Sequence, residues 1–520
     1  AGTPSARRRA GAASASSDAL ADRAWTDVLV AVDVGTSGAR AAAFDLDGHR
    51  RLEVRRSYPT RSPRPGWAEQ DPLAWRAASI AALAGLVRAV GPRRRVLGIG
   101  LTGQCPTVCL VDDRHRPLGP GLLYRDNRAT AEAAWIRERL GDVAVHRRTG
   151  HLPAAFHIAP KLMWLRDHEP ELFARARLAL QPRDLVALAL TGEPATDGTH
   201  AAATLAFDLR RGDWDPGLIE SLELPAALFP SVRPSWAAVG ALRPSVATRL
   251  GLPAATAVVL GGADSQACAL GAAVVSPGPV SEMAGSSTCL NAAVPQPLDE
   301  PRVTHYPHVV PGPFTTETGI NTSGAAVAWF AALAYGGRRG RATTADYARL
   351  DAEVAAVEPG ADGLLALPTL ADGERTDPGL RGALTGLSLR HGRAEVARAI
   401  LESVAYEIRD QLALLTRGGA PVTELRVSGG DTRLGSWNRI KADVTGLPVA
   451  TIPGDAAVTG VAMLAGLGAS VYRDVDEAIA RCVRPEASIE PDASAARRYD
   501  EGFATWRELL SASVVRRDGG

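Results

Sequence analysis

The stretch DVLVAVDVGTSGARAAAFDLDGHR, residues 27–50, decides the fold of this chain. It begins with a short apolar run rich in β-branched side chains, which is typical of a buried central strand. The run ends at a Gly-Thr-Ser-Gly turn, residues 35–38, and a second strand pattern covers residues 39–45. Asp47-Gly48 then favours a tight hairpin into a third strand. We therefore predict three consecutive antiparallel strands at this point.

A related pattern opens the second half of the chain. The segment PVSEMAGSSTCLNAA, residues 279–293, resembles LVAVDVGTSGARAAA, residues 29–43, in its order of strand, hydroxyl-rich turn and strand. Helix and strand patterns alternate elsewhere, which is typical of an α/β protein with covered sheets. Because 520 residues are too many for one core, the duplication predicts two similar domains facing each other across a cleft.

The breaker Ser276-Pro277-Gly278-Pro279 indicates where the two domains meet. We expect an N-terminal domain over residues 26–274, a C-terminal domain over residues 280–515, and a disordered tail over residues 1–25. The tail is rich in Ala and Ser and has a basic cluster, but no apolar segment follows the cluster as a signal peptide would require.

Bulk composition narrows the classes of function. The formal net charge is +1, no Lys/Arg stripe stands out beyond the tail, and no apolar run approaches the roughly 18–20 residues that span a bilayer. The five cysteines are odd in number and lack CxxC spacing, which argues against a disulfide scaffold or zinc site. We expect a cytoplasmic protein that binds a small molecule and neither nucleic acid nor membrane, with a homodimer as one option.

The two hydroxyl-rich turns are candidate phosphate sites, because such turns aim several backbone N–H groups at one point. Asp33 precedes the first turn and could hold Mg²⁺, whereas Met283 stands at the matching position of the second copy. This asymmetry predicts a single site between the halves. A plain tight hairpin is the alternative interpretation of either turn alone. A P-loop is excluded, because neither Lys161 nor Lys441 lies in GxxxxGK[ST].

A second carboxylate lies where an apolar strand pattern ends. The run TAVVL, residues 256–260, leads through two glycines to Asp264. Transfer of a phosphoryl group to a hydroxyl needs a base that accepts the hydroxyl proton. Asp264 could be that base, or it could cap the helix predicted over residues 265–271, and the two roles are compatible.

Several blocks together resemble the FGGY carbohydrate kinases, particularly the xylulokinase branch. The similarity extends from about residue 27 to about residue 510. The blocks are residues 33–40, 66–72, 101–104, 261–264, 373–376, 382–386 and 428–431. That family belongs to the actin-like, ribonuclease-H-like ATPases. The resemblance therefore implies an α/β fold of two such domains around a nucleotide and sugar cleft, with ATP and Mg²⁺ as cofactors.

The resemblance also assigns roles to residues. Asp264 would be the general base, and Asp33 would belong to the Mg-phosphate site. The residues implied at the nucleotide are Gly35, Thr36, Ser37, Arg40, Gly285, Ser286, Ser287, Thr288, Gly429, Gly430, Asp431 and Asn438. The residues implied at the sugar, besides Asp264, are Gln104, Cys105, Pro106 and Ser265.

The chain departs from the xylulokinase pattern at the sugar side. Cys105-Pro106-Thr107 replaces a Met-His-Gly that touches the sugar, and Asp455 stands where Glu is commoner. We predict ATP-dependent phosphorylation of a small sugar hydroxyl, most directly of a pentulose such as D-xylulose. The alternatives are ribulose, fuculose, erythritol or glycerol as substrate, or a non-kinase actin-like ATPase or sugar sensor, which would not need Asp264 as a base.

Overall fold

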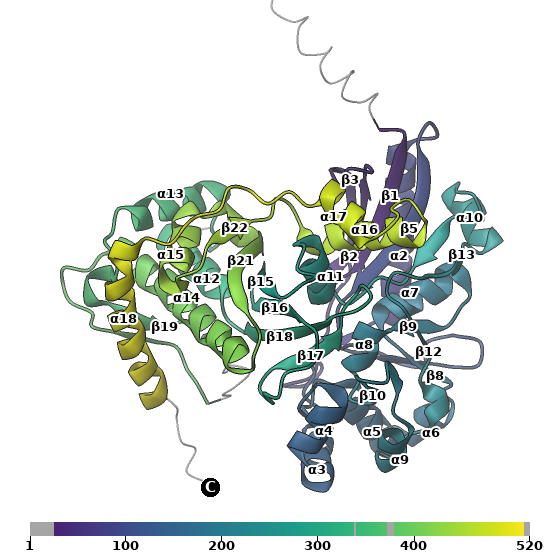
Figure 1. Ribbon diagram of the computed structural model, residues 1–520. Helices are drawn as coiled ribbons and strands as arrows, with labels where there is room; N and C mark the ends of the chain where they lie inside the picture. Colours follow the sequence, from purple (N-terminus) through teal and green to yellow (C-terminus); the bar gives the residue numbers. More distant parts are fainter. Residues whose placement is uncertain (1–24, 337–339, 372–378, 514–520) are drawn as a thin grey trace, which may run out of the picture.

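The computed structural model describes residues 25–336, 340–371 and 379–513. Two six-stranded mixed sheets dominate it, and helices cover both (Figure 1). The prediction of an α/β fold with two sheet-based domains is therefore confirmed. The predicted tail up to residue 24 and the block at residues 373–376 lie outside the described residues.

The first sheet contains the three strands predicted from residues 27–50. β1 pairs antiparallel with β2, and β2 pairs antiparallel with β3, whereas β5 lies parallel to β1 and β14 lies parallel to β5. In spatial order the strands are β13 (Ala238–Ala241), β14 (Ala257–Val259), β5 (Arg95–Gly103), β1 (Asp27–Val34), β2 (Gly38–Phe44) and β3 (Arg50–Ser57). β1 is central and its side chains are buried, as its apolar run predicts.

The second sheet repeats this arrangement, which confirms the duplication. β15 pairs antiparallel with β16 and β16 with β18, whereas β21 lies parallel to β15 and β22 parallel to β21. In spatial order the strands are β17 (Thr304–Pro307), β18 (Phe314–Ile320), β16 (Thr288–Val294), β15 (Gly278–Ala284), β21 (Val422–Gly429) and β22 (Val449–Thr451). The order β3-β2-β1-β5-β14 thus returns as β18-β16-β15-β21-β22.

Helix α2 (Pro72–Val90) covers β2 and β3 of the first sheet. Asp71 caps it by accepting a hydrogen bond from the N–H of Leu73, and the helix ends before Gly91. By length and composition alone α2 could cross a membrane. However, Trp75, Leu83 and Leu86 are fully buried against the protein, so α2 is a core helix.

The remaining elements of the first half lie on or beside the first sheet. Helices α7 (Pro182–Thr191) and α10 (Pro244–Leu250) pack on that sheet and α2 and share their apolar core. The other helices are α3 (Thr130–Leu140), α4 (Asp142–Thr149), α5 (Ile158–His168), α6 (Pro170–Ala174), α8 (Gly198–Ala202) and α9 (Pro216–Ser221). The short strands are β4 (Glu69–Gln70), β6 (Cys109–Val111), β7 (Gly121–Leu122), β8 (Leu178–Leu180), β9 (Ala195–Asp197), β10 (Phe207–Asp208), β11 (Asp213–Trp214) and β12 (Ser231–Arg233).

Long helices pack around the second sheet and share one apolar core with it. They are α12 (Gly324–Tyr335), α13 (Thr344–Ala355), α14 (Arg393–Arg417), α15 (Gly435–Thr445) and α18 (Ala493–Ala512). The hairpin β19 (Leu365–Leu367) and β20 (Ala383–Thr385) lies at the edge of this domain.

Two helices pack together where the chain passes between the sheets. α11 (Asp264–Gly271) contacts α16 (Ala456–Gly468), and α17 (Val475–Cys482) follows. The helix backbones approach so closely that a Cβ on Gly271 would lie 1.9 Å from the carbonyl oxygen of Ala456. α16 then packs on β1 and β5, so a segment late in the sequence covers the first sheet (Figure 1).

Candidate active site

Arg40 links two carboxylates from distant parts of the chain. It lies opposite Asp33 in the β1–β2 pairing, and its Nη2 donates to Asp33 Oδ2 at 3.0 Å. Its Nη1 donates to Asp455 Oδ2 at 2.5 Å. Asp455 also caps α16 by accepting from the N–H of Val458. Asp33, the predicted metal ligand, therefore lies beside the guanidinium of Arg40 and close to the start of α16.

Asp264 is the first residue of α11, and the preceding Ala263 is the cap. Its Oδ1 accepts a hydrogen bond from the N–H of Ser265 at 2.9 Å. Burial raises the pKa of Asp264 to about 7, and the charges of Asp33 and Glu317 act in the same direction. A carboxylate that titrates near neutral pH is suited to accept a proton from a hydroxyl group.

The pKa of Asp33 is also raised above its ordinary value. Burial is the main cause, and the charge of Asp455 adds to it, whereas Arg40 opposes the shift. Asp33 and Asp264 therefore influence one another, because each carboxylate disfavours the ionisation of a neighbour. The structure brings these two predicted residues into one electrostatic site.

Both predicted phosphate turns lie at strand ends with accessible residues. Thr36 is half-buried and Ser37 is exposed, and Ser286 and Ser287 are exposed in the second turn. Thr288 differs, because it is fully buried and its hydroxyl lies 2.8 Å from that of Ser323. Its side chain therefore lies in the core and does not contribute a hydroxyl donor to the turn.

The loop at residues 429–431, predicted to lie at the nucleotide, depends on a glycine in a conformation that other residues rarely adopt. Gly429 has a φ of 100°, and a Cβ there would lie 2.1 Å from the carbonyl oxygen of Ala284. Only glycine fits such a position, because L side chains disfavour positive φ and no room is left. The loop is thereby held against the end of β15, next to the second turn.

The polar side chains of this loop face inward. Asp431 lies 3.3 Å from the Nζ of Lys441, which also donates to Glu282 Oε1 at 2.6 Å. Asn438 is buried and donates to the carbonyl oxygen of Asp431. Asp431 and Asn438 thus stabilise the loop, whereas Gly430 is exposed.

The structure places the predicted sugar-binding residues in different surroundings. Cys105 lies near Asp264, whose charge, after burial, helps raise the pKa of the Cys105 thiol. Gln104 is buried and donates to Gln70 Oε1 at 2.9 Å. Pro106 follows Cys105 through a cis peptide bond and is buried, and the hydroxyl of Ser265 donates to Glu317.

Sequence reasoning missed several residues that support the site. Glu317 on β18 reaches Ser265 and Gln266 on α11, at 2.7 Å and 3.1 Å. Gln70 donates to the carbonyl oxygen of Thr36 at 2.7 Å and so supports the first turn. Gln70 belongs to a family-like block, which was a signal for it, whereas no local pattern marks Glu317.

Two family models divide the chain between them. The N-terminal domain of the FGGY family of carbohydrate kinases matches residues 28–271, and the C-terminal domain of the same family matches residues 281–469. The chain belongs to the FGGY family of carbohydrate kinases. FGGY kinases use ATP and a sugar or polyol, so this FGGY kinase is a transferase of that class.

Relatives of this FGGY kinase differ in the substrates that their names state. The chain is 28% identical to xylulose kinase of Bacillus subtilis over 490 residues, which cover 93% of this chain and 96% of that protein. It is 32% identical to glycerol kinase of Leptothrix cholodnii over 509 residues, 94% and 99% of the two chains. The solved xylulose kinase from Rhodospirillum rubrum superposes with a TM-score of 0.86 at 32% identity, covering 93% and 98%. The two domains of the present chain therefore match the pair of actin-like domains of FGGY kinases.

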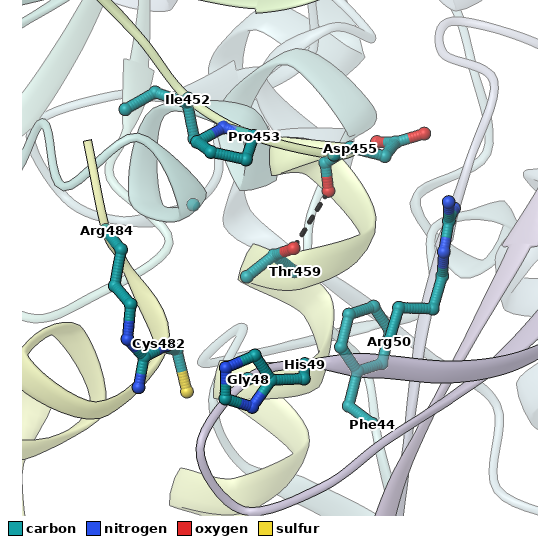
Figure 2. A pocket seen from close by; sticks show the side chains of 12 residues that line it. Phe44, Gly48, His49, Arg50, Ile452, Pro453, Asp455, Thr459, Cys482 and Arg484 are labelled. Atoms are coloured by element: carbon teal, nitrogen blue, oxygen red, sulfur yellow. Dashed lines mark hydrogen bonds between the residues drawn. The ribbon is translucent and has the colours of Figure 1, made fainter. Parts of the chain in front are cut away.

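A cavity of about 380 Å³ lies beside the site, at the junction of the two domains of this FGGY kinase (Figure 2). The β2–β3 hairpin lines it through Gly48, His49 and Arg50, and residues 452–455, which lead from β22 to α16, form another wall. Gly271, at the end of α11, lines it as well. Neither Asp33 nor Asp264 lines the cavity, so the cavity adjoins the connecting segments and not the two predicted catalytic carboxylates.

Proposed function

We propose that this FGGY kinase transfers the γ-phosphoryl group of ATP to a hydroxyl of a pentulose, with D-xylulose the leading candidate. The observation that carries this proposal is the environment of Asp264. Its pKa is raised to about 7 at the start of α11, beside Asp33 and Cys105. A base of this kind accepts the proton of the attacking hydroxyl while the new O–P bond forms.

In this proposal the two turns hold the phosphates. Exposed backbone at Gly285, Ser286 and Ser287 would bind phosphate oxygens from one domain, and Thr36 and Ser37 would do so from the other. Such groups act mainly by positioning and by stabilising charge, because phosphoryl transfer needs little covalent help from the protein.

The residues present fit a magnesium ion that keeps most of its ligands from phosphate and water. Among the residues that the structure describes, no group of three His, Cys, Asp or Glu side chains could enclose a metal. Mg²⁺ in kinases is usually held by one or two carboxylates plus phosphates. Asp33 would be the protein ligand, and the bound ion would neutralise charge on the phosphates.

A polyol such as glycerol is the second candidate substrate. The identity to a glycerol kinase, 32%, is as high as that to the solved xylulose kinase. Cys105 and Pro106 also replace a pattern that contacts the sugar in xylulokinases, and Pro106 has no donor to offer. A site that lacks a donor for one hydroxyl would discriminate differently among sugars.

The test is ADP release from Mg-ATP with D-xylulose, ribulose, fuculose, erythritol and glycerol, each against a control without sugar. The proposal expects the highest kcat/KM with D-xylulose and little turnover without sugar. The highest value with glycerol or erythritol would favour the second candidate. Turnover that does not depend on any of these compounds would refute both.

A further inference from the structure

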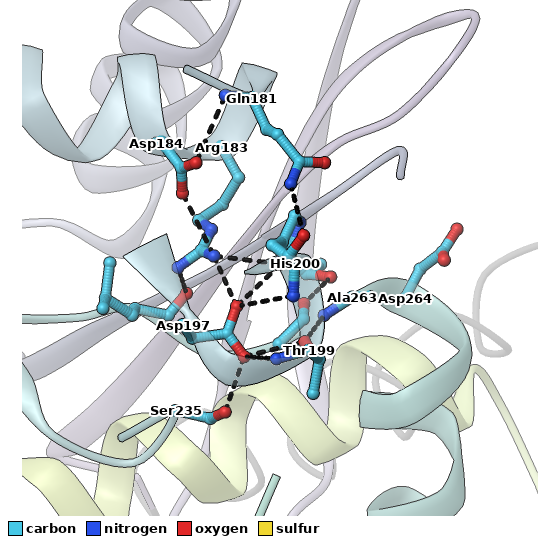
Figure 3. A network of polar contacts seen from close by, with 12 residues as sticks. Gln181, Arg183, Asp184, Asp197, Thr199, His200, Ser235, Ala263 and Asp264 are labelled. Atoms are coloured by element: carbon cyan, nitrogen blue, oxygen red, sulfur yellow. Dashed lines mark hydrogen bonds and ion pairs between the residues drawn. The ribbon is translucent and has the colours of Figure 1, made fainter. Parts of the chain in front are cut away.

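The segment that carries Asp264 is held by polar residues from elsewhere in the first domain. Residues 260–263 join β14 to Asp264 at the start of α11, and each of the four has a backbone group in a hydrogen bond; Figure 3 shows the one at Ala263. The contacts are Arg183 Nη1 to Leu260 O at 2.9 Å, Gly261 N to Ser235 O at 2.8 Å, Thr102 Oγ1 to Gly262 O at 2.7 Å, and Ala263 N to Thr199 Oγ1 at 2.8 Å.

Asp197 connects three of these four contacts. Its carboxylate accepts from Arg183 Nη2 at 2.6 Å, from Thr199 Oγ1 at 2.7 Å and from Ser235 Oγ at 2.7 Å, and His200 Nδ1 lies 2.7 Å from its Oδ1. Asp197, Arg183, Thr199 and His200 are fully buried. Although burial opposes it, the pKa of Asp197 is lowered by Arg183 and these hydrogen bonds, so the carboxylate stays ionised.

The direction of the Thr199 hydroxyl is therefore fixed. A hydroxyl has one proton, and Thr199 gives that proton to Asp197 Oδ2. A lone pair of the same oxygen then faces the N–H of Ala263, the residue directly before Asp264.

The network does not touch the carboxylate of Asp264. Figure 3 shows the Asp264 side chain directed away from the cluster, while the Ala263 backbone faces the cluster. Buried ion pairs contribute little to stability compared with apolar packing of the same volume. Their concentration next to this segment is better accounted for by the orientation that they impose on it.

We propose that Thr199, oriented by Asp197, is a positioning residue for phosphoryl transfer, because it fixes the backbone from which the Asp264 side chain departs. The inference rests on the proposed function, in which Asp264 is the base. A displacement of about 1 Å at a reacting group can lower the rate about 10²-fold. A single hydrogen bond at Ala263 can therefore control kcat without contacting the substrate.

The test compares Thr199→Val, which keeps the shape but lacks the hydroxyl, with Thr199→Ser, which keeps the hydroxyl. We expect kcat of Thr199→Val to fall about 10- to 100-fold while KM for sugar and for ATP changes less than about threefold. Thr199→Ser should stay within about threefold of the parent. Thr199→Ala also removes the hydroxyl but adds no methyl group in its place. Its kcat should match that of Thr199→Val, and it replaces Thr199→Val in the test if the valine variant folds poorly.

A double variant shows whether Thr199 acts through Asp264. In the Asp264→Asn background, Thr199→Val should lower kcat by less than about twofold further, because residues that act as a unit are not additive. A full additional loss would refute the proposal. So would an unchanged kcat in folded Thr199→Val and Thr199→Ala, even with a lowered Tm.

The two levels of the proposal fail in different ways. Near-parental kcat for Asp264→Asn alone would refute the base assignment, and the positioning role with it. A large loss in Asp264→Asn with no loss in the Thr199 variants would leave the base in place and refute the positioning role alone.

Discussion

Nη1 of Arg40 lies 2.5 Å from Oδ2 of Asp455, although 415 residues separate the two in the chain. The same guanidinium holds Asp33, so one cation joins the end of β1 to the start of α16. Because Asp455 also caps α16, a shift of this helix would disturb the carboxylate that we propose for Mg²⁺ binding. The geometry of α16 and that of the proposed phosphate site are therefore coupled.

Replacing the proposed base should lower turnover with little effect on binding. We expect Asp264→Asn to lower kcat by about 10²–10⁴, the contribution of a positioned base, while calorimetry still detects ATP and sugar. Asp299→Asn is the control, because its side chain is exposed and its nearest ion-pair partner lies 3.9 Å away. Equal kcat in the two variants would rule out Asp264 as the base.

Activity should decline on the acid side of neutrality. Asp264 has a pKa of about 7, and its protonated form cannot accept a proton, so kcat/KM should fall as pH drops through about 7. Glu317→Gln removes a charge that raises this pKa, so the decline should move to lower pH. Glu358→Gln, whose side chain is exposed, is the control. An acid limb that does not move in Glu317→Gln would contradict the electrostatic coupling.

Loss of the Asp33 carboxylate should affect Mg-ATP more than the sugar. We expect Asp33→Asn to raise the KM for Mg-ATP at least about tenfold, the scale on which lost partners of a metal act. The Kd for sugar should change little, because Asp33 is bonded to Arg40 and not to the predicted sugar residues. Titrations of Mg²⁺ and of sugar measure the two effects separately, and the reverse pattern would mean that the metal lies elsewhere.

The predicted nucleotide loop at residues 429–431 offers a matched pair of glycines. Gly429→Ala introduces a Cβ 2.1 Å from a carbonyl oxygen at a φ of 100°, so we expect a loss of about 2 kcal/mol or more in unfolding free energy and a raised KM for ATP. Gly430→Ala meets no heavy atom within 4 Å and should be nearly neutral. Chemical denaturation and ATP saturation curves compare the two, and equal stability would show that the loop relaxes.

Local patterns in the sequence were sufficient for the strands and for the duplication. The strand-turn-strand patterns of residues 27–50 and of residues 279–293 predicted β1, β2, β15 and β16, because a buried strand and its turn are determined by neighbouring residues.

Side-chain direction and long-range contacts could not be predicted in the same way. Thr288 belongs to a hydroxyl-rich turn in the sequence, but the pleat of β16 turns it into the core. Ser265 follows Asp264, yet its hydroxyl donates a hydrogen bond to Glu317, which lies more than fifty residues later in the chain. The cluster around Asp197 combines three separate segments, Arg183, residues 197–200 and Ser235, and only the folded backbone brings them together.

The return of α16 to the first sheet has a consequence for synthesis of the chain. Leu29 and Ala31 of β1 pack with Val461 and Ala465 of α16, which leave the ribosome more than 400 residues later. At roughly 5–20 residues per second, synthesis of the chain between β1 and α16 takes on the order of tens of seconds, and this apolar face stays uncovered during that time. The nascent protein therefore exposes this apolar face of the sheet until α16 has been synthesised, and a chaperone that binds exposed apolar surface would act mainly in that interval.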